Sequence, residues 1–137
     1  METKIKLTSI SEGSMNESIF CSTGVIPFCT IDNVYLMPNK PVLIHTGLKL
    51  ESIYSLVPLE LHIRSNEECV LKDGLIINAT AISDMNNEEI SFVAVWTGSD
   101  TNNNFKIEDK MLFIPKGSHI ADGYLYPAAK EDFMIEY

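Results

Sequence analysis

The sequence lacks an excess of basic residues, a long apolar run and an apolar signal segment. It holds 10 Lys and Arg against 19 Asp and Glu, a formal net charge of -9 with a pI near 4.6. Nucleic acid and anionic membranes bind basic surfaces, so both are excluded as expected partners. No apolar run approaches the roughly 18 residues of a membrane-spanning helix, and the first residues lack a signal-peptide core. We therefore expect a soluble cytoplasmic protein whose acidic surface suits a basic protein partner.

Cysteine and histidine are also scarce. The cysteines are Cys21, Cys29 and Cys69. No two of them form a Cys-x-x-Cys pair, so neither a disulfide framework nor a zinc knuckle is indicated, and we expect buried free thiols. The histidines are His45, His62 and His119. They lie far apart in the sequence without metal-ligand spacing, so no histidine-based metal site is predicted.

Helical patterns are nearly absent, and short β segments dominate. Apolar or alternating segments occur at residues 34–37, 42–45, 48–50, 54–64, 75–77, 90–96, 105–107, 111–114 and 124–126. Segments 75–77 and 90–96 are continuously apolar or β-branched, which is typical of strands buried on both faces. Only 66–71 and 128–133 are suited to a helical turn. The pattern predicts an all-β barrel or jelly roll with little helix.

The 137 residues are enough for one domain with its own core. We expect an N-terminal strand or arm over residues 1–22, with one leading edge strand and otherwise loop. The β-barrel domain is expected over 23–127 and a short tail over 128–137. Thr46-Gly47 is expected to break the strand that begins at residue 42.

Residues 116–127, Lys-Gly-Ser-His-Ile-Ala-Asp-Gly-Tyr-Leu-Tyr-Pro, predict a tight turn and then an apolar and aromatic strand ended by proline. This segment resembles the Lys-Gly-Asp-Arg-Ile-Ala-Gln-Leu-Val motif of the trimeric dUTPase family. Ser118 and His119 stand at the acidic and basic pair of that motif, and Asp122 stands at its glutamine. A neutral imidazole at His119 cannot supply the bidentate phosphate clamp of an arginine.

Two earlier segments are similar to motifs of the same family, in the same order. Residues 23–29, Thr-Gly-Val-Ile-Pro-Phe-Cys, resemble Ala-Gly-Tyr-Asp-Leu-Tyr-Ala, with Ile26 at the aspartate that helps organise the metal and phosphate end of the site. Isoleucine cannot coordinate magnesium, which needs oxygen ligands. Arg64-Ser65-Asn66 resembles Arg-Ser-Gly, whose serine and backbone contact the phosphates. The alternative for Ser65 is a turn cap.

The stretch from Gly74 to Ile90 resembles the third motif, Thr-Ile-Asp-Ala-Asp-Tyr-Arg-Gly-Glu-Ile. Ser83 stands at the carboxylate that activates the attacking water, and Asn86 at the tyrosine beneath the deoxyribose. A serine hydroxyl without a partner base is a poor general base. Asp84 is one residue away, and on an extended segment that shift turns its side chain to the opposite face. The alternative for this stretch is a solvated loop before a strand.

The resemblance ends before the glycine-rich C-terminal arm of the family, because residues 128–137 contain no glycine. The backbone N–H groups of such a glycine-rich arm, which would bind an anion, have no counterpart in these residues. Residues 97–115 form a longer connection than the usual hairpin of the family, with no role assigned.

The resemblance implies a dUTPase-like distorted β-barrel and a homotrimer. No catalytic residue is assigned, because the matching positions are altered or displaced. These degenerate positions are Ile26, Ser83, Asp84, Asn86 and His119. The candidates for a remaining ligand pocket are Arg64, Ser65, Asn66, Gly74, Ile77 and Asn78. No metal or cofactor is expected, and Mg²⁺ is implied only if the chain is active.

Three functions remain open from the sequence. The first is a dUTPase-fold protein that has lost pyrophosphatase activity and binds a protein or nucleotide partner. It would be a viral or phage accessory protein in the host cytoplasm. The second is an active dUTP or dNTP pyrophosphatase with relocated catalytic groups. The third is an unrelated jelly-roll structural protein, such as a capsid or decoration subunit.

Overall fold

The computed structural model describes residues 3–10, 18–22, 24–78, 80–82 and 88–127. The strands are β1 Lys4–Ser9, β2 Ser18–Ser22, β3 Ile26–Cys29, β4 Val34–Leu36, β5 Val42–Tyr54, β6 Leu59–Ser65, β7 Leu75–Ile77, β8 Thr80–Ile82, β9 Glu89–Trp96, β10 Lys106–Glu108, β11 Met111–Ile114 and β12 His119–Pro127. A helical turn that includes η1, Cys69–Asp73, lies between β6 and β7. The predicted all-β class with little helix is confirmed, and the helical turn expected at 66–71 is present one to two residues further along.

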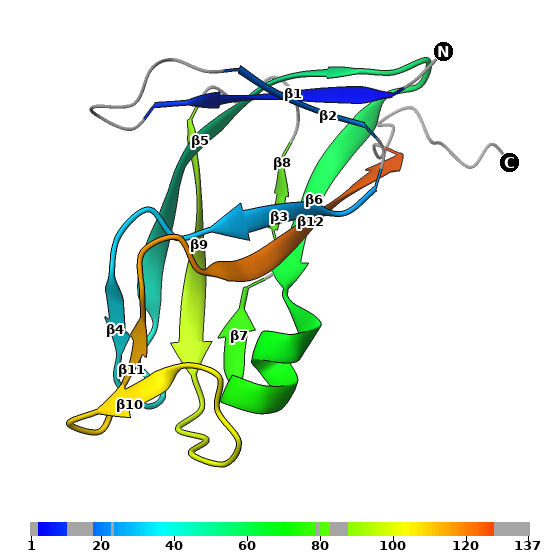
Figure 1. The fold of residues 1–137 in the computed structure, drawn as a ribbon. Helices are drawn as coiled ribbons and strands as arrows, with labels where there is room; N and C mark the ends of the chain where they lie inside the picture. Colours follow the sequence, from blue (N-terminus) through cyan, green and yellow to red (C-terminus); the bar gives the residue numbers. More distant parts are fainter. Residues whose placement is uncertain (1–2, 11–17, 23, 79, 83–87, 128–137) are drawn as a thin grey trace, which may run out of the picture.

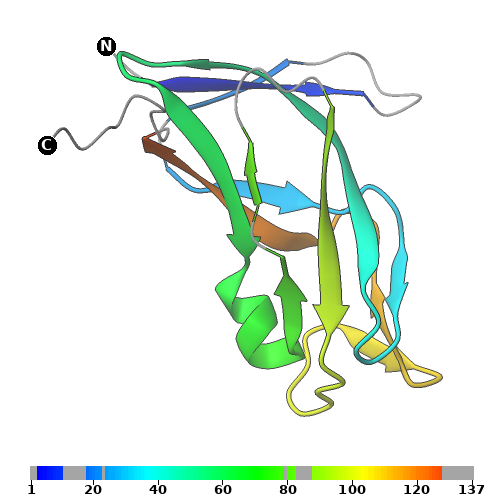
Figure 2. The ribbon, with the colours of Figure 1, turned by 180° about the vertical axis from the view of Figure 1, so that it is seen from behind.

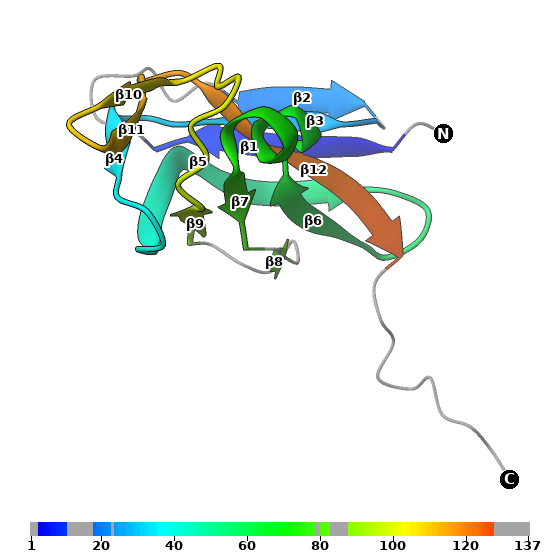
Figure 3. The ribbon, with the colours of Figure 1, turned by 90° about the horizontal axis from the view of Figure 1, so that it is seen from below.

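The strands form three antiparallel sheets. Their orders are β2-β1-β5-β9-β7, β3-β12-β6-β8 and β10-β11-β4. Strands β3 and β12 cross in front of the long strand β9 in Figure 1, and β9 lies in front of them in Figure 2. One apolar cluster joins the sheets, with Phe28 from β3, Leu61 from β6 and Phe92 from β9 among its members. Figure 3 shows η1 at the near end of the molecule, beside β7.

The strands expected to be buried on both faces are fully buried on one face only. Along β9 the residues alternate, with Ile90, Phe92, Ala94 and Trp96 buried and the residues between them half-buried. In β7 the middle residue, Ile76, is 45% exposed. The expectation of burial on both faces is therefore wrong for this chain, because the second face is only half-buried along β9 and is exposed at Ile76 in β7.

The expected strand break at Thr46-Gly47 is also wrong, because β5 continues through it as a bulge. The pairing with β9 shifts register between His45 and Lys49. Thr46 Oγ1 donates to the Ile90 carbonyl at 2.7 Å, and the Gly47 N–H donates to Glu89 Oε2 at 2.8 Å. Gly47 has φ of 71°, which a glycine adopts without strain.

The N-terminal segment contributes two strands instead of the single edge strand that we expected. Strand β1 lies inside its sheet, between β2 and β5, and its Ile5 and Leu7 are buried in the core. The segment expected as one strand over 54–64 is divided, because β5 ends at Tyr54 and β6 begins at Leu59. Within β6 the predicted alternation is confirmed, with Leu61 and Ile63 buried.

The long connection after β9 is attached to the end of the helical turn. Asp73 is fully buried, and its Oδ1 accepts the N–H groups of Asn104 at 2.8 Å and Phe105 at 2.9 Å. Trp96 Nε1 donates to the Asp73 carbonyl at 3.0 Å. Gly74 ends the turn at φ 65°, where an added Cβ would lie 2.3 Å from Thr97 Oγ1. One residue pair, Asp73-Gly74, thus positions the connection against η1.

The cysteines differ in environment. Cys69 is buried and Cys29 is exposed, both as free thiols, so the expectation of burial is wrong for Cys29. The side chain of Cys21 is outside the described residues. No helix in the described part of the chain is long and apolar enough to cross a membrane.

Candidate functional site

The antiparallel pairing of β6 with β12 assembles the candidate site. Its register places Arg64 opposite Asp122 and Ser65 opposite Ala121. At the end of β6, the Asn66 N–H donates to the Ile120 carbonyl at 3.1 Å, and the chain then enters the helical turn. The Arg-Ser-Asn segment and the His-Ile-Ala-Asp segment, far apart in sequence, therefore meet at one place.

An open cleft of about 610 Å³ lies over this junction. It is lined by Val25, Arg64, Ser65, Asn66, Glu67, Glu68, Leu71, Lys72, Asp122 and Tyr124. Three of the predicted ligand-binding residues, Arg64, Ser65 and Asn66, are thus brought together in one cleft. Gly74, Ile77 and Asn78 do not line it.

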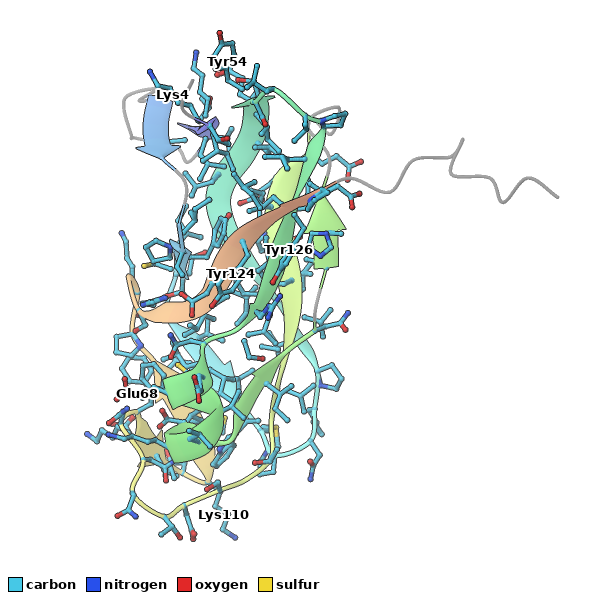
Figure 4. All side chains as sticks on the ribbon, turned by 90° about the vertical axis from the view of Figure 1, so that its right-hand side faces the viewer. Lys4, Tyr54, Glu68, Lys110, Tyr124 and Tyr126 are labelled. Atoms are coloured by element: carbon cyan, nitrogen blue, oxygen red, sulfur yellow. The ribbon has the colours of Figure 1, made fainter. Side chains whose placement is uncertain are left out.

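Arg64 is held by aromatic side chains of β12. Its guanidinium carbon lies 4.5 Å from the ring centroid of Tyr124 and 5.5 Å from that of Tyr126. Nη2 of Arg64 donates to the Tyr126 hydroxyl at 2.5 Å. Figure 4 shows the two labelled tyrosines side by side along β12. A guanidinium engaged in cation–π contacts is partly occupied before any anion arrives.

Ser65 bonds to the backbone of β7. Its Oγ accepts the Ile77 N–H at 2.6 Å and donates to the Ile77 carbonyl at 3.1 Å. Because the single hydroxyl proton is used by this carbonyl, Ser65 acts here as a clamp between β6 and β7. This bond joins two strands and does not cap a turn, so it is not the turn cap expected as the alternative, and the phosphate contact stays a prediction.

Asp122 is a largely buried carboxylate at the cleft, with 7% of the residue exposed. Its Oδ2 accepts from Asn66 Nδ2 at 3.0 Å, and its Oδ1 lies 2.6 Å from His119 Nε2. Asn66 Oδ1 in turn accepts the Cys69 N–H at 3.1 Å, which caps the helical turn. Asp122 thus links β12 to that turn through one asparagine.

The ionisable groups of the cleft are predominantly acidic. Asp122, Glu67 and Glu68 supply the carboxylates, and Arg64 and Lys72 the cations. Lys72 Nζ lies 3.3 Å from Glu68 Oε1. Hydrogen bonds from Asn104 and then Lys72 lower the pKa of the Glu68 carboxyl. Since one cation is paired with Glu68 and the other contacts two tyrosine rings, the cleft offers little free positive charge.

The other predicted site residues are dispersed. Ile26 is 2% exposed and belongs to the core. Gly74 ends the helical turn, and Asn78 is exposed with its N–H donating to the Val93 carbonyl at 2.8 Å. His119 starts β12, and its Nε2 bonds to Asp122 Oδ1. The positions Ser83, Asp84 and Asn86 are outside the described residues.

From the sequence, Asp122 was noted only as a replacement for the glutamine of the family motif. Neither Asp122 nor Tyr124 was among the predicted site residues. The available signal was a charged residue inside an otherwise apolar strand pattern, three residues after a histidine. A buried carboxylate needs hydrogen-bond partners. For Asp122 one partner, His119, lies on the same strand, and the other, Asn66, follows β6.

The site also bears on whether a divalent metal could bind. Within the described residues, no group of three or more His, Cys, Asp or Glu side chains is placed to hold a metal ion. Ile26, at the position of the family aspartate, offers no ligand atom. Within the described residues, the cleft therefore contains no preassembled site of three such ligands for Mg²⁺. The absence of a resident metal in the whole chain stays a prediction.

No protein-family model and no curated protein matches this sequence. Solved structures of phage dUTPases do resemble it. A Staphylococcus bacteriophage 80alpha dUTPase, described as controlling transfer of virulence genes by a proto-oncogenic G protein-like mechanism, is 15% identical with a TM-score of 0.72, over 96% of this chain and 95% of that one. An 80alpha dUTPase variant with dUpNHpp is 15% identical with a TM-score of 0.70, over 96% of this chain and 87% of that one.

A dUTPase variant from phage phi11 of S. aureus, described for its coordination of a structural Mg(II) ion, is 13% identical with a TM-score of 0.73. That match covers 96% of this chain and 95% of the other. Likeness at this identity concerns the fold alone. The predicted dUTPase-like fold is confirmed over nearly the whole chain, and the function needs a separate argument from the site.

Proposed function

We propose that this protein is a dUTPase-fold binding module that has lost pyrophosphatase activity. The observation that carries the proposal is the buried Asp122 carboxylate, hydrogen-bonded to Asn66 and His119 at the cleft that the resemblance assigns to phosphate. Two like unit charges 4 Å apart near a protein surface repel each other by about 4 kcal/mol. A triphosphate would therefore meet a carboxylate where a phosphate site needs donors.

The contacts of the remaining candidates support the same proposal. Arg64 is stacked on Tyr124, and the Ser65 hydroxyl is used by the backbone of β7. Ile26 is buried in the core, so it cannot contribute to a metal site. These side chains stabilise the fold at the positions where the resemblance implies catalytic and phosphate-binding groups.

A direct assay tests the loss of activity. The purified protein is incubated with each dNTP and Mg²⁺, with an active dUTPase as positive control, and pyrophosphate release is followed. We expect no release above the enzyme-free background. Turnover of about 1 per second or more, in the range of ordinary enzymes, would overturn the proposal.

The alternative function is an active dUTP or dNTP pyrophosphatase with relocated catalytic groups. The dUTPase-like fold over 96% of the chain favours it, and Asp84 is the carboxylate nearest in sequence to the expected catalytic position. If activity is found, Asp84→Asn should abolish it and Ser83→Ala should not. The opposite pattern would place the base elsewhere.

We also propose that the protein is a homotrimer. Several large apolar side chains are exposed in the isolated chain, including Leu56 at 77%, Leu71 at 75% and Tyr54 at 58%. Burying such side chains in a closed oligomer removes them from water and also protects edge strands. Light scattering after size exclusion should give three times the chain mass, and a monomer at micromolar concentration would contradict this.

For the partner, we propose a protein with a basic surface, with a nucleotide as a second candidate. The net charge of -9 supports the first choice. Similar folds belong to phage proteins, one of which is described as controlling gene transfer, and this supports a phage accessory role in the host cytoplasm. A jelly-roll structural protein would instead assemble into large particles, which the same scattering experiment detects.

A further inference from the structure

An uncharged apolar row crosses the outer face of the five-stranded sheet. Leu43 of β5 pairs with Val93 of β9, and Val95 of β9 pairs with Ile76 of β7. Antiparallel partners share a face of the sheet, and so do residues two apart on one strand. These four side chains therefore lie together across β5, β9 and β7, and we call them the β9 row.

The β9 row is open to solvent in the isolated chain. Leu43 is 54% exposed and Ile76 is 45% exposed, while Val93 and Val95 are half-buried. The residues that alternate with them along β9 are buried in the core. Figure 2 views the molecule from the side of the row, with β9 in front of β3 and β12. A contiguous apolar face of this kind is typical of a contact with another protein.

Polar groups border the row. Asn78 and Thr97, which follow β7 and β9, are exposed. On these three strands, the ionisable residues nearest to the row in sequence are His45 and Glu89, whose Nδ1 and Oε1 atoms lie 3.1 Å apart. The second oxygen of Glu89 accepts the Gly47 N–H at 2.8 Å. An apolar centre with a polar border is the usual composition of a protein interface.

The lack of charge in the row suits contact with another copy of the same chain. In a closed cyclic oligomer, a residue beside the rotation axis meets the same residue of a neighbouring copy. An ionisable residue at that place would face its own charge, and such like-charge contacts are repulsive. The chain has 19 acidic and 10 basic residues, so ordinary parts of its surface would bring like charges together.

Other exposed apolar side chains are less suited to this position, because charged residues lie beside them. Tyr54 stands opposite Lys4 in the pairing of β5 with β1, and Figure 4 shows both at one end of the molecule. Leu71 lines the larger cleft together with Glu67 and Glu68. These side chains are suited to a contact with a different surface, away from an axis.

We propose that the β9 row is the face through which copies of this chain contact one another around a rotation axis. The inference rests on the proposed homotrimer and names the surface that holds its copies together. Packing the row against its counterparts removes aliphatic side chains from water and buries no unpaired charge. A basic protein partner needs acidic groups, which the row lacks, so that partner would bind elsewhere.

The test introduces a charge into the row and measures the mass of the full chain by light scattering after size exclusion. Leu43→Glu and Leu43→Lys replace an exposed side chain, so both should fold, which circular dichroism checks. We expect the concentration at which the oligomer dissociates to rise by at least about a hundredfold in each. Val57→Glu is the matched control, because Val57 is 55% exposed on the hairpin between β5 and β6, and it should retain the mass of the parent protein.

A mixture of the two Leu43 variants tests whether the row contacts itself. At an axis, glutamate on one copy meets lysine on another, so equimolar Leu43→Glu and Leu43→Lys should associate where neither does alone. If the row instead packed against an acidic surface of the neighbour, Leu43→Lys alone would stay associated. That outcome, or no recovery on mixing, would contradict the proposal.

Ile76→Glu provides a second position if the Leu43 variants do not fold, and it should dissociate the oligomer in the same way. A trimeric parent that tolerates charge at both positions, or that Val57→Glu dissociates equally, would disprove this inference and leave the homotrimer standing. A dimeric parent that Leu43→Glu dissociates would support the face and disprove the number of copies. A monomeric parent would overturn both.

Discussion

Removal of the Asp122 carboxylate should destabilise the protein by about 2–5 kcal/mol. In Asp122→Ala, Asn66 Nδ2 loses a charged acceptor at 3.0 Å in a part-buried position, which costs about 1–3 kcal/mol. Asn66 also caps the helical turn through Cys69, and loosening that cap costs about 1 kcal/mol more. The His119 side chain is 43% exposed, so water replaces much of its bond and only about 0.2–1 kcal/mol is lost there.

Asp122→Asn separates geometry from charge. An asparagine oxygen can still accept from Asn66 Nδ2, so we expect a loss of only about 1 kcal/mol. Asp32→Ala, which removes an exposed carboxylate, is the control for net charge and should stay within about 0.5 kcal/mol of the parent protein.

Urea unfolding followed by circular dichroism measures these differences in the free energy of unfolding. All variants must be compared at one protein concentration, because oligomer stability depends on it. An Asp122→Ala variant within about 0.5 kcal/mol of the parent would refute the reasoning. A loss in Asp122→Asn equal to that in Asp122→Ala would show that the charge, rather than the hydrogen bond to Asn66, carries the stability.

Three further measurements test the structure. Gly123→Ala would place a methyl group 2.7 Å from a Phe28 ring atom, so its free energy of unfolding should fall by about 1–3 kcal/mol, and an unchanged urea midpoint would contradict this packing. With iodoacetamide, exposed Cys29 should be alkylated well before buried Cys69. The Cys69 thiol keeps its proton until the pH approaches its pKa of about 12, and the thiolate is the reactive form. Mass spectrometry that finds Cys69 modified first would contradict its burial. Hydrogen bonds from Thr8 and then Lys6 lower the pKa of Glu51, so NMR should find that it titrates at a lower pH than a glutamate without such partners. Its contribution to stability should be present above the unfolded pKa and lost as the pH falls through the folded one.

Local patterns were a good guide to which side of a strand is buried. Leu61 and Ile63 face the core as their alternation with polar neighbours predicted, because side chains point to opposite faces along any strand. The same local patterns were a poor guide to where a strand ends and to whether both of its faces are buried. Thr46-Gly47 lies within a bulge, and only one face of β9 is fully buried. Local patterns miss both features, because both depend on how strands distant in sequence pair and pack.

For the candidate site, the sequence likewise predicted some of the residues but not their hydrogen-bond partners. The sequence alone pointed to Arg64, Ser65 and Asn66, and the structure gathers them in one cleft. Their actual partners, such as Ile77 for Ser65, follow from contacts between separate elements. A motif shows which residue types recur in order, but the hydrogen bonds depend on register.

By itself, the sequence determined that the chain is acidic, that it is built mostly of short strands with little helix, and that its motifs follow the order of a dUTPase-like fold. Only the tertiary structure decided that Asp122 joins His119 to Asn66 and that Asp73 holds the connection after β9 with one oxygen left unsatisfied. The physical reason is distance along the chain. Asn66 and Asp122 are 56 residues apart, so no local pattern encodes their contact.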